Sequence, residues 1–165
     1  MSKNNENVYY MARKKSGCTR EKAAELLESI PPERIERIEN NKFNIHPDEV
    51  IRMAEVYKDP TLCNHYCSNE CPIGMQYVPE IKIKDLTQIV LEMLSSLNSM
   101  KKSQERLIEI TADGVIDDTE LTDFIFIQQE LERISVTVET LQLWAEQMIA
   151  EGKIDMDKYN AIKNA

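Results

Sequence analysis

The regular spacing of apolar residues between positions 86 and 148 constrains the fold more than any other feature of the sequence. Apolar residues recur there every three or four positions, which is the repeat of one face of an α-helix. The first half of the repeat consists of Leu86, Val90, Met93, Leu97, Met100 and Leu107, and the second half of Phe124, Ile127, Leu131, Ile134, Val138, Leu141, Ala145 and Met148. The turn residues 112–114 separate the halves. We therefore predict two helices of about 25 residues that form an antiparallel hairpin.

The apolar stripe of the second helix is wider than one partner helix needs. Ile125, Leu143 and Trp144 extend it beyond the main repeat. Because a hairpin by itself leaves such a surface in water, we expect two copies of the chain to associate into a four-helix bundle. The sequence thus predicts a homodimer held together by its C-terminal helices.

The composition agrees with an all-α fold. The 165 residues include only four glycines and six prolines, which leaves little material for strand-connecting turns, whereas the abundant Ala, Leu, Glu and Lys favour helices. No apolar run approaches the ~20 residues needed to cross a bilayer, and residues 1–6 carry no apolar signal segment. We therefore expect a cytoplasmic protein with reduced cysteines and no membrane partner.

The net charge of −9 is unevenly distributed along the chain. Residues 1–58 contain 11 Lys and Arg against 10 Asp and Glu, so the excess of acidic residues belongs almost entirely to the remainder. A polyanion such as DNA would be repelled by the acidic part. If the protein binds DNA, the contacts are therefore expected from the N-terminal segment.

That N-terminal segment is predicted to hold four short helices. The patterns place them at residues 8–15, 20–27 and 33–40, and from 47 or 48 until Asp59-Pro60. Thr19 is a suitable N-cap for the second helix, and Pro31-Pro32 precede the third, in which Ile35 and Ile38 are expected to point inward. Small residues at 23 and 24 allow the second and third helices to cross closely.

The order and detail of these helices resemble a known family. Residues 13–27 read RKKSGCTREKAAELL and residues 37–42 read RIENNK, a run that closely resembles the XRE (lambda-repressor/Cro-like) helix-turn-helix family. The resemblance covers roughly residues 6–58. Three features depart from the family pattern: Arg20 replaces the usual Gln, the turn after residue 27 is one residue longer, and Asn41 replaces Gly.

The resemblance implies a set of DNA contacts. It places Pro32, Glu33, Arg34, Glu36 and Arg37 along the segment that faces the major groove. Arg34 and Arg37 would read bases or phosphates, and Glu33 would accept a hydrogen bond from cytosine N4.

Further residues acquire roles from the same resemblance. Arg20, at the head of the second helix, would contact a phosphate, and Lys42 and Asn44 would hold the DNA backbone. Arg13 would pair with Glu39 inside the domain, which is a structural role.

Three cysteines follow the N-terminal helices at equal intervals. Cys63, Cys67 and Cys71 are spaced by four, with His65 between the first two, so on a continuous helix the thiols would share one face. Three thiolates and His65 would suit Zn²⁺ or an iron–sulfur cluster, although the spacing is not a standard zinc pattern. The alternatives are small apolar cysteines packed at a domain junction and a thiol redox sensor. No other cofactor is expected.

The sequence therefore predicts a helix-turn-helix DNA-binding domain (residues 1–62), a cysteine-containing linker (63–80) and a helical hairpin for dimerisation or effector binding (81–165). Because the chain lacks a catalytic triad, a phosphate-binding loop and a zinc-protease motif, we do not expect an enzyme. The predicted function is a homodimeric, sequence-specific transcriptional regulator that binds double-stranded DNA. The alternative is a redox- or metal-sensing interaction adaptor whose helix-turn-helix fold is not used on DNA.

Overall fold

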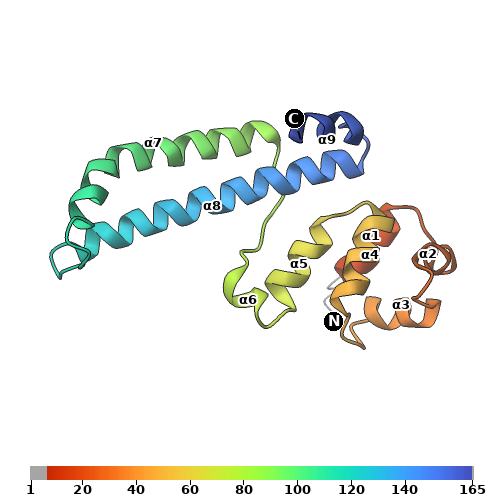
Figure 1. The fold of residues 1–165 in the computed structure, drawn as a ribbon. Coiled ribbons are helices and arrows are strands. Elements are labelled where there is room, and N and C mark those ends of the chain that lie inside the picture. Colours follow the sequence, from red (N-terminus) through yellow and green to blue (C-terminus); the bar gives the residue numbers. More distant parts are fainter. Residues whose placement is uncertain (1–6, 165) are drawn as a thin grey trace. The chain divides into compact units, whose positions relative to one another are not determined.

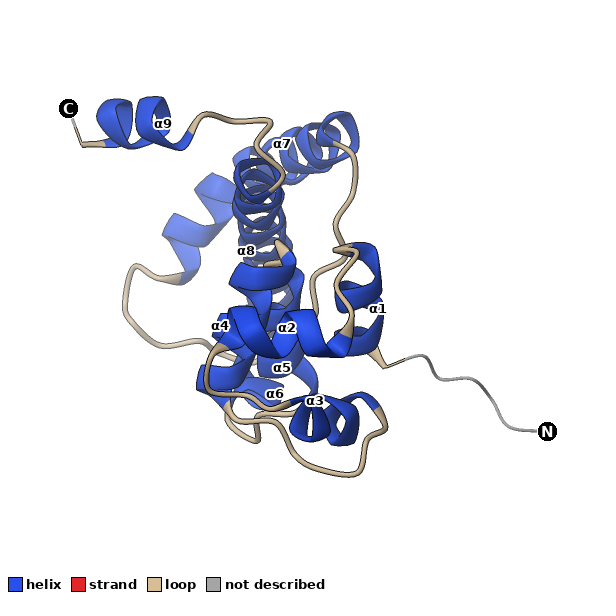
Figure 2. Ribbon diagram, turned by 90° about the vertical axis from the view of Figure 1, so that its right-hand side faces the viewer, coloured by secondary structure: helices blue, strands red, loops and turns tan. Residues whose placement is uncertain are grey.

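The computed structural model describes residues 7–164, which contain nine helices and no strand (Figures 1 and 2). The predicted all-α class is therefore confirmed. The helices are α1 (Val8–Lys15), α2 (Arg20–Leu27), α3 (Pro32–Glu39), α4 (Pro47–Tyr57), α5 (Thr61–Asn69), α6 (Gly74–Tyr77), α7 (Leu86–Ile110), α8 (Leu121–Ala150) and α9 (Met156–Lys163). Residues 1–6, which the sequence assigned to the first domain, and residue 165 lie outside the described part.

The described chain divides into two compact units. The first comprises the chain up to Glu80 together with the chain from Ala145, and the second comprises Ile81–Trp144. This differs from the predicted boundaries, because segment 63–80 was expected to be a linker and the chain beyond 145 was assigned to the hairpin domain. The physical reason lies in α5, where Leu62 is buried in the core of the first unit and Cys63 and Tyr66 pack against it.

Local sequence signals set the ends of the short helices. Thr19 caps α2, as predicted, by accepting a hydrogen bond from the amide of Lys22 at 3.1 Å. Asn7, which was not predicted to be a cap, caps α1 by accepting one from the amide of Tyr9 at 2.9 Å. Pro32 occupies the first turn of α3. After α3 the chain turns through Asn41, whose φ of 55° lies in the left-handed region that asparagine tolerates.

The core of the first unit is formed by α1 to α5. Ile35 and Ile38 on the inner face of α3 are fully buried, as predicted. Val50, Met53 and Leu62 are further large side chains that are fully buried in this core. Gly74 lets α6 approach α5, because a Cβ at this position would lie 2.1 Å from the carbonyl oxygen of Cys67. Only glycine fits there without moving the backbone.

The second unit contains α7 and most of α8, which run antiparallel as the apolar spacing predicts (Figure 1). Gly114, with φ of 75°, lies in the connecting turn. Arg106 of α7 donates to Asp123 Oδ2 of α8 at 2.7 Å, which joins the two helices close to this turn. None of the described helices has the length and apolar character that crossing a lipid bilayer requires.

The buried positions of α8 are unexpectedly polar. They include Glu130 (3% exposed), Thr137 and Thr140, and both threonine hydroxyls donate to backbone carbonyls one turn earlier, at 2.8 and 2.7 Å. Leu131 and Val138, which belong to the predicted apolar repeat, remain 46% and 40% exposed. The hairpin therefore leaves much of its own apolar stripe in water, in agreement with the expectation that it cannot cover this surface alone.

Candidate nucleic-acid interface

The two helices of the predicted DNA-reading motif pack tightly. Ala23 of α2 is fully buried, and its small side chain allows α3 to come close enough for Leu27 and Ile35 to enter the same core. With Ile35, Ile38 and Glu39 turned inward, α3 presents Glu33, Glu36 and Arg37 to solvent. An exposed helix face next to a close helix crossing is the geometry with which such motifs enter the major groove.

Arg37 and Lys42 are the most available cations of the predicted DNA contacts. Both are exposed, and within residues 7–164 neither forms an ion pair. The amide of Lys42 donates to the carbonyl of Arg37 at 2.9 Å, which fixes the loop against the end of α3. Asn44 is exposed in the same loop, and Pro32 is half-buried at the opposite end of α3.

Arg34, the other predicted reader, is bound within the protein. Its guanidinium donates to both carboxylate oxygens of Glu49 on α4, at 2.8 and 2.7 Å, and to the carbonyl of Asn44 at 3.0 Å. It also lies over the ring of Phe43, 4.6 Å from the centroid, and its side chain is only 16% exposed. Arg34 therefore joins α3 to α4 and to the intervening loop.

The partner of Arg34 has an altered pKa. Burial alone would raise the pKa of Glu49, but the hydrogen bonds from Arg34 and from the amide of His46 outweigh it and lower the pKa below its usual range. Glu49 thus contributes stability above the pKa of an unfolded glutamate, about 4.3. The contribution is lost as the pH falls through the lower pKa of the folded state.

We expect Glu49→Gln to lower the free energy of unfolding at neutral pH by about 1–2 kcal/mol, because it breaks the charged, bidentate hydrogen bonding between Arg34 and Glu49. The difference from the wild type should shrink between about pH 5 and pH 2 as the wild-type carboxylate is protonated. Urea titrations across this range measure it. Glu33→Gln, which alters an exposed carboxylate, is the matched control, and identical pH dependence in wild type and Glu49→Gln would contradict the assignment.

Glu39 is the centre of a buried charge network. Arg13 Nη2 donates to Glu39 Oε2 at 3.0 Å, with both side chains almost fully buried, so the structural pair implied by the family resemblance is present. Arg20 Nε donates to the same oxygen at 2.8 Å, and Arg20 Nη1 lies 3.8 Å from Glu36 Oε1. The guanidinium expected to contact a phosphate is therefore partly neutralised by Glu39 and Glu36. The sequence did not predict this pairing of Arg20.

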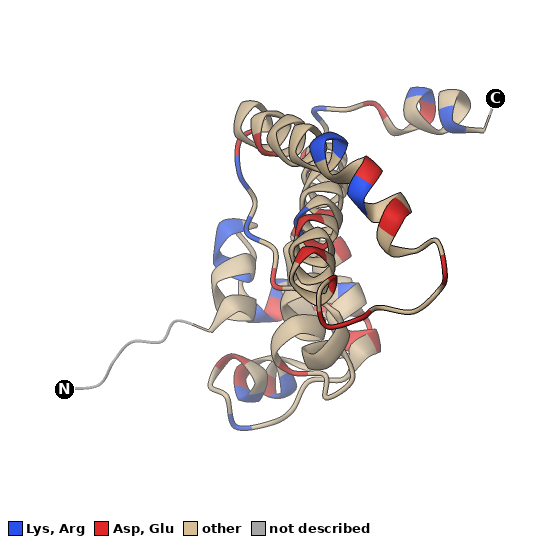
Figure 3. Ribbon diagram, turned by 90° about the vertical axis from the view of Figure 1, so that its left-hand side faces the viewer, with Lys and Arg blue, Asp and Glu red and all other residues tan. Residues whose placement is uncertain are grey.

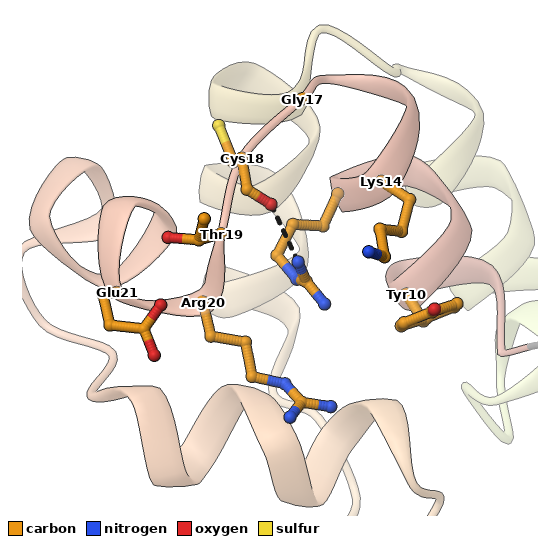
Figure 4. A pocket seen from close by; sticks show the side chains of 8 residues that line it. Tyr10, Lys14, Gly17, Cys18, Thr19, Arg20 and Glu21 are labelled. Carbon is orange, nitrogen blue, oxygen red and sulfur yellow. Dashed lines mark hydrogen bonds between the residues drawn. The ribbon is translucent and has the colours of Figure 1, made fainter.

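A cleft of about 550 Å³ lies where α1 meets the start of α2 (Figure 4). Arg13 Nη1 donates to the carbonyl of Cys18 at 2.8 Å, the dashed line in the figure. Arg20 reaches in from α2, and Lys14 and Tyr10 face it from α1. Cations beside a helix N-terminus suit an anion such as a backbone phosphate.

Sequence reasoning missed Tyr10 and Lys14 as members of this cleft. The available signal was the basic last turn of α1, which holds Arg13, Lys14 and Lys15. In the structure, basic residues are interspersed with acidic ones (Figure 3). The candidate interface therefore offers a few exposed cations rather than a uniformly basic surface.

The cysteine segment, predicted as a linker, is largely helical. Cys63 and Cys67 lie on α5, and the sulfur of Cys71, beyond its end, accepts a hydrogen bond from the amide of Gly74 at 3.5 Å. His65 lies 3.7 Å from Glu70 Oε1 and packs edge-on against Tyr9. In the part of the chain that the structure describes, no three His, Cys, Asp or Glu side chains are grouped so that they could hold a metal ion. The zinc or iron–sulfur hypothesis therefore rests on spacing alone.

Comparison with known proteins agrees with this geometry. Residues 10–59 match the family model HTH_3, described as helix-turn-helix, and this range contains α1 to α4 with Arg20, Arg37 and Lys42. No curated protein and no solved structure matches the chain. Residues 10–59 therefore form a DNA-binding helix-turn-helix domain of the XRE family.

Proposed function

We propose that this protein is a cytoplasmic, sequence-specific transcriptional regulator that binds double-stranded DNA as a homodimer and has no enzymatic activity. The observation that carries the proposal is the exposed face of α3 within a matching helix-turn-helix domain. Arg37 supplies a free guanidinium for a base edge or phosphate, and Lys42 and the α1–α2 cleft supply backbone contacts. Glu33 is exposed and can accept from cytosine N4.

The surface of the second unit supports the proposed dimer. Large apolar side chains are exposed along both of its helices: Leu86, Val90, Leu91, Leu94, Leu97 and Ile108 on α7, and Leu121, Ile125, Phe126, Leu131 and Val138 on α8. So much apolar surface on one helix pair marks an interaction site. A second copy offers the same stripe and would complete a four-helix bundle. Two copies would present two α3 helices to half-sites about one duplex turn apart.

Binding to selected DNA tests the proposal. Genomic fragments retrieved by the purified protein should share a two-fold symmetric site, and binding should weaken as salt rises. Arg37→Ala is expected to reduce affinity about 5- to 150-fold at that site, and Lys42→Ala to weaken all sequences similarly.

Lys101→Ala, which removes an exposed cation outside the helix-turn-helix domain, serves as the control and should bind as the wild type does. If no fragment is retained at any salt concentration, the proposed DNA function is wrong.

One observation favours the second candidate, a redox- or metal-sensing interaction adaptor. Two of the predicted DNA-contacting arginines, Arg20 and Arg34, are held by Glu39 and Glu49, which lowers the positive charge offered to a polyanion. Under this alternative, the selection returns no site and the cysteines govern binding to a protein. Metal analysis of anaerobically purified protein, with Cys67→Ser as comparison, separates the metal-sensing version of this alternative from the redox-sensing one. Bound zinc or iron indicates a metal sensor, and protein without bound metal indicates a sensor based on thiol chemistry.

A further inference from the structure

A second cavity, a groove of about 530 Å³, opens beside α4 in the first unit. Ile51 and Ala54 of α4, Cys63 of α5, Ile149 at the end of α8 and Met156 of α9 contribute its apolar lining. None of these residues belongs to the DNA interface described above. A volume within about 300–1,000 Å³ and a mainly apolar lining are typical of small-molecule sites.

Two large apolar side chains at this groove remain in contact with water. Ile51 and Met156 are both about half exposed, although Ala54 beside them is buried. An occupant would remove this surface from water and gain the corresponding hydrophobic free energy. The groove is therefore shaped to bind an apolar group of limited size.

Charged groups of predominantly one sign accompany the apolar lining. The exposed carboxylates of Glu55 and Glu146 both line the groove. Lys58 lines the groove too. Within residues 7–164, however, neither Glu55 nor Glu146 forms an ion pair with Lys58 or with any other cation. The groove thus combines apolar surface with two unpaired negative charges.

Cys63 lines the same groove, and the pKa of its thiol reflects the carboxylates nearby. Burial raises its pKa first, and the neighbouring Cys67, Glu146 and Glu55 raise it further, so Cys63 stays protonated at neutral pH. The negative charges of Glu55 and Glu146 are therefore both close enough to Cys63 to act on its thiol. Their convergence there would favour a positive charge on whatever enters.

We propose that this groove binds a small amphipathic organic cation. Its apolar body would lie against Ile51, Ala54 and Ile149, and its ammonium group would lie near Glu55 and Glu146. An anion of the same shape would be repelled by the carboxylates, and a neutral molecule would leave them unpaired. The occupant would contact both α4 of the helix-turn-helix domain and the last turns of α8.

Calorimetric titration of the full chain tests the proposal. The probe is decyltrimethylammonium below its micelle concentration, and decyl sulfate is the anion of equal chain length. We expect the cation to bind at least about tenfold more tightly than the anion, and Glu55→Gln/Glu146→Gln to remove about tenfold of the cation affinity. Glu25→Gln/Glu105→Gln, which neutralises two exposed carboxylates outside the groove, should bind as the wild type does.

Alkylation locates the bound probe. Saturating decyltrimethylammonium should slow the modification of Cys63 by N-ethylmaleimide while leaving Cys71, outside the groove, unchanged as the internal reference. The proposal is overturned if the cation does not bind, if decyl sulfate binds equally well, or if Cys63 is not protected. Modification of Cys63 that slows with protein concentration alone would instead assign the groove to a second copy. Because no DNA is present, these outcomes are independent of the proposed DNA function.

Discussion

Replacing Glu39 by alanine is expected to lower the free energy of unfolding of the first unit by about 3–5 kcal/mol. Glu39 receives hydrogen bonds from Arg13 and Arg20, and the Arg13–Glu39 pair is almost fully buried. The substitution leaves the Arg13 guanidinium charged, buried and without its counterion, which costs more than the loss of one favourable contact. In the wild type the hydrogen bond to Glu39 raises the pKa of Arg13 further. In the variant the guanidinium still keeps its proton at neutral pH, because arginine is too strong a base to be deprotonated inside a protein.

Hydrogen exchange of the amides in α1 to α3 measures this loss in the unit concerned, and urea unfolding followed by circular dichroism measures it for the whole chain. Glu36→Ala is the matched control. Glu36 lies on the same helix, but its side chain is exposed and its ion pair with Arg20 is long at 3.8 Å. We expect a change within about 0.5 kcal/mol for the control. Equal losses in the two variants would show that the buried network does not stabilise the fold.

Leu131→Glu is expected to weaken self-association by roughly a thousandfold. Leu131 is half exposed in the middle of the apolar stripe of α8, so the proposed four-helix bundle would bury it at a central position. A charge there costs about 2 kcal/mol or more, and two-fold symmetry introduces the substitution twice. Sedimentation velocity over a range of protein concentrations measures the monomer–dimer equilibrium.

Gln129→Glu adds the same charge to α8 at an exposed position away from Leu131, and it should dimerise as the wild type does. Both variants should retain the helix content of the wild type, because neither position is buried within the chain. A wild-type chain that sediments as a monomer at all concentrations would refute the dimer, and unchanged association of Leu131→Glu would place the interface elsewhere.

Much of the local structure was predictable from the sequence. The bounds of α1 and α2 agree with those predicted from the apolar spacing and, for α2, from the capping residue Thr19. Such signals act between residues a few positions apart, so they can be recognised in the chain itself. The inward direction of Ile35 and Ile38 follows from the same short-range periodicity.

The candidate site was predictable only in part. The family resemblance selected Arg20, Arg34 and Arg37 alike, but Arg34 meets Glu49, fifteen residues away on another helix. Arg20 meets Glu39 across the helix crossing. Neither pairing follows a spacing that can be recognised in the sequence, because each joins residues on different helices. The structure therefore distinguishes an exposed arginine, Arg37, from two that are already bound.

The sequence by itself determined the helical class, the order of the short helices and the family of residues 10–59, because these depend on propensity, capping and motif. Only the tertiary structure decided which cations remain available, that α5 joins the first unit, and that α8 buries Glu130 and Thr137 while Leu131 stays in water. The physical reason is that α8 carries apolar residues on more than one face. Periodicity shows that a helix is amphipathic, but contacts between distant residues decide which face is covered.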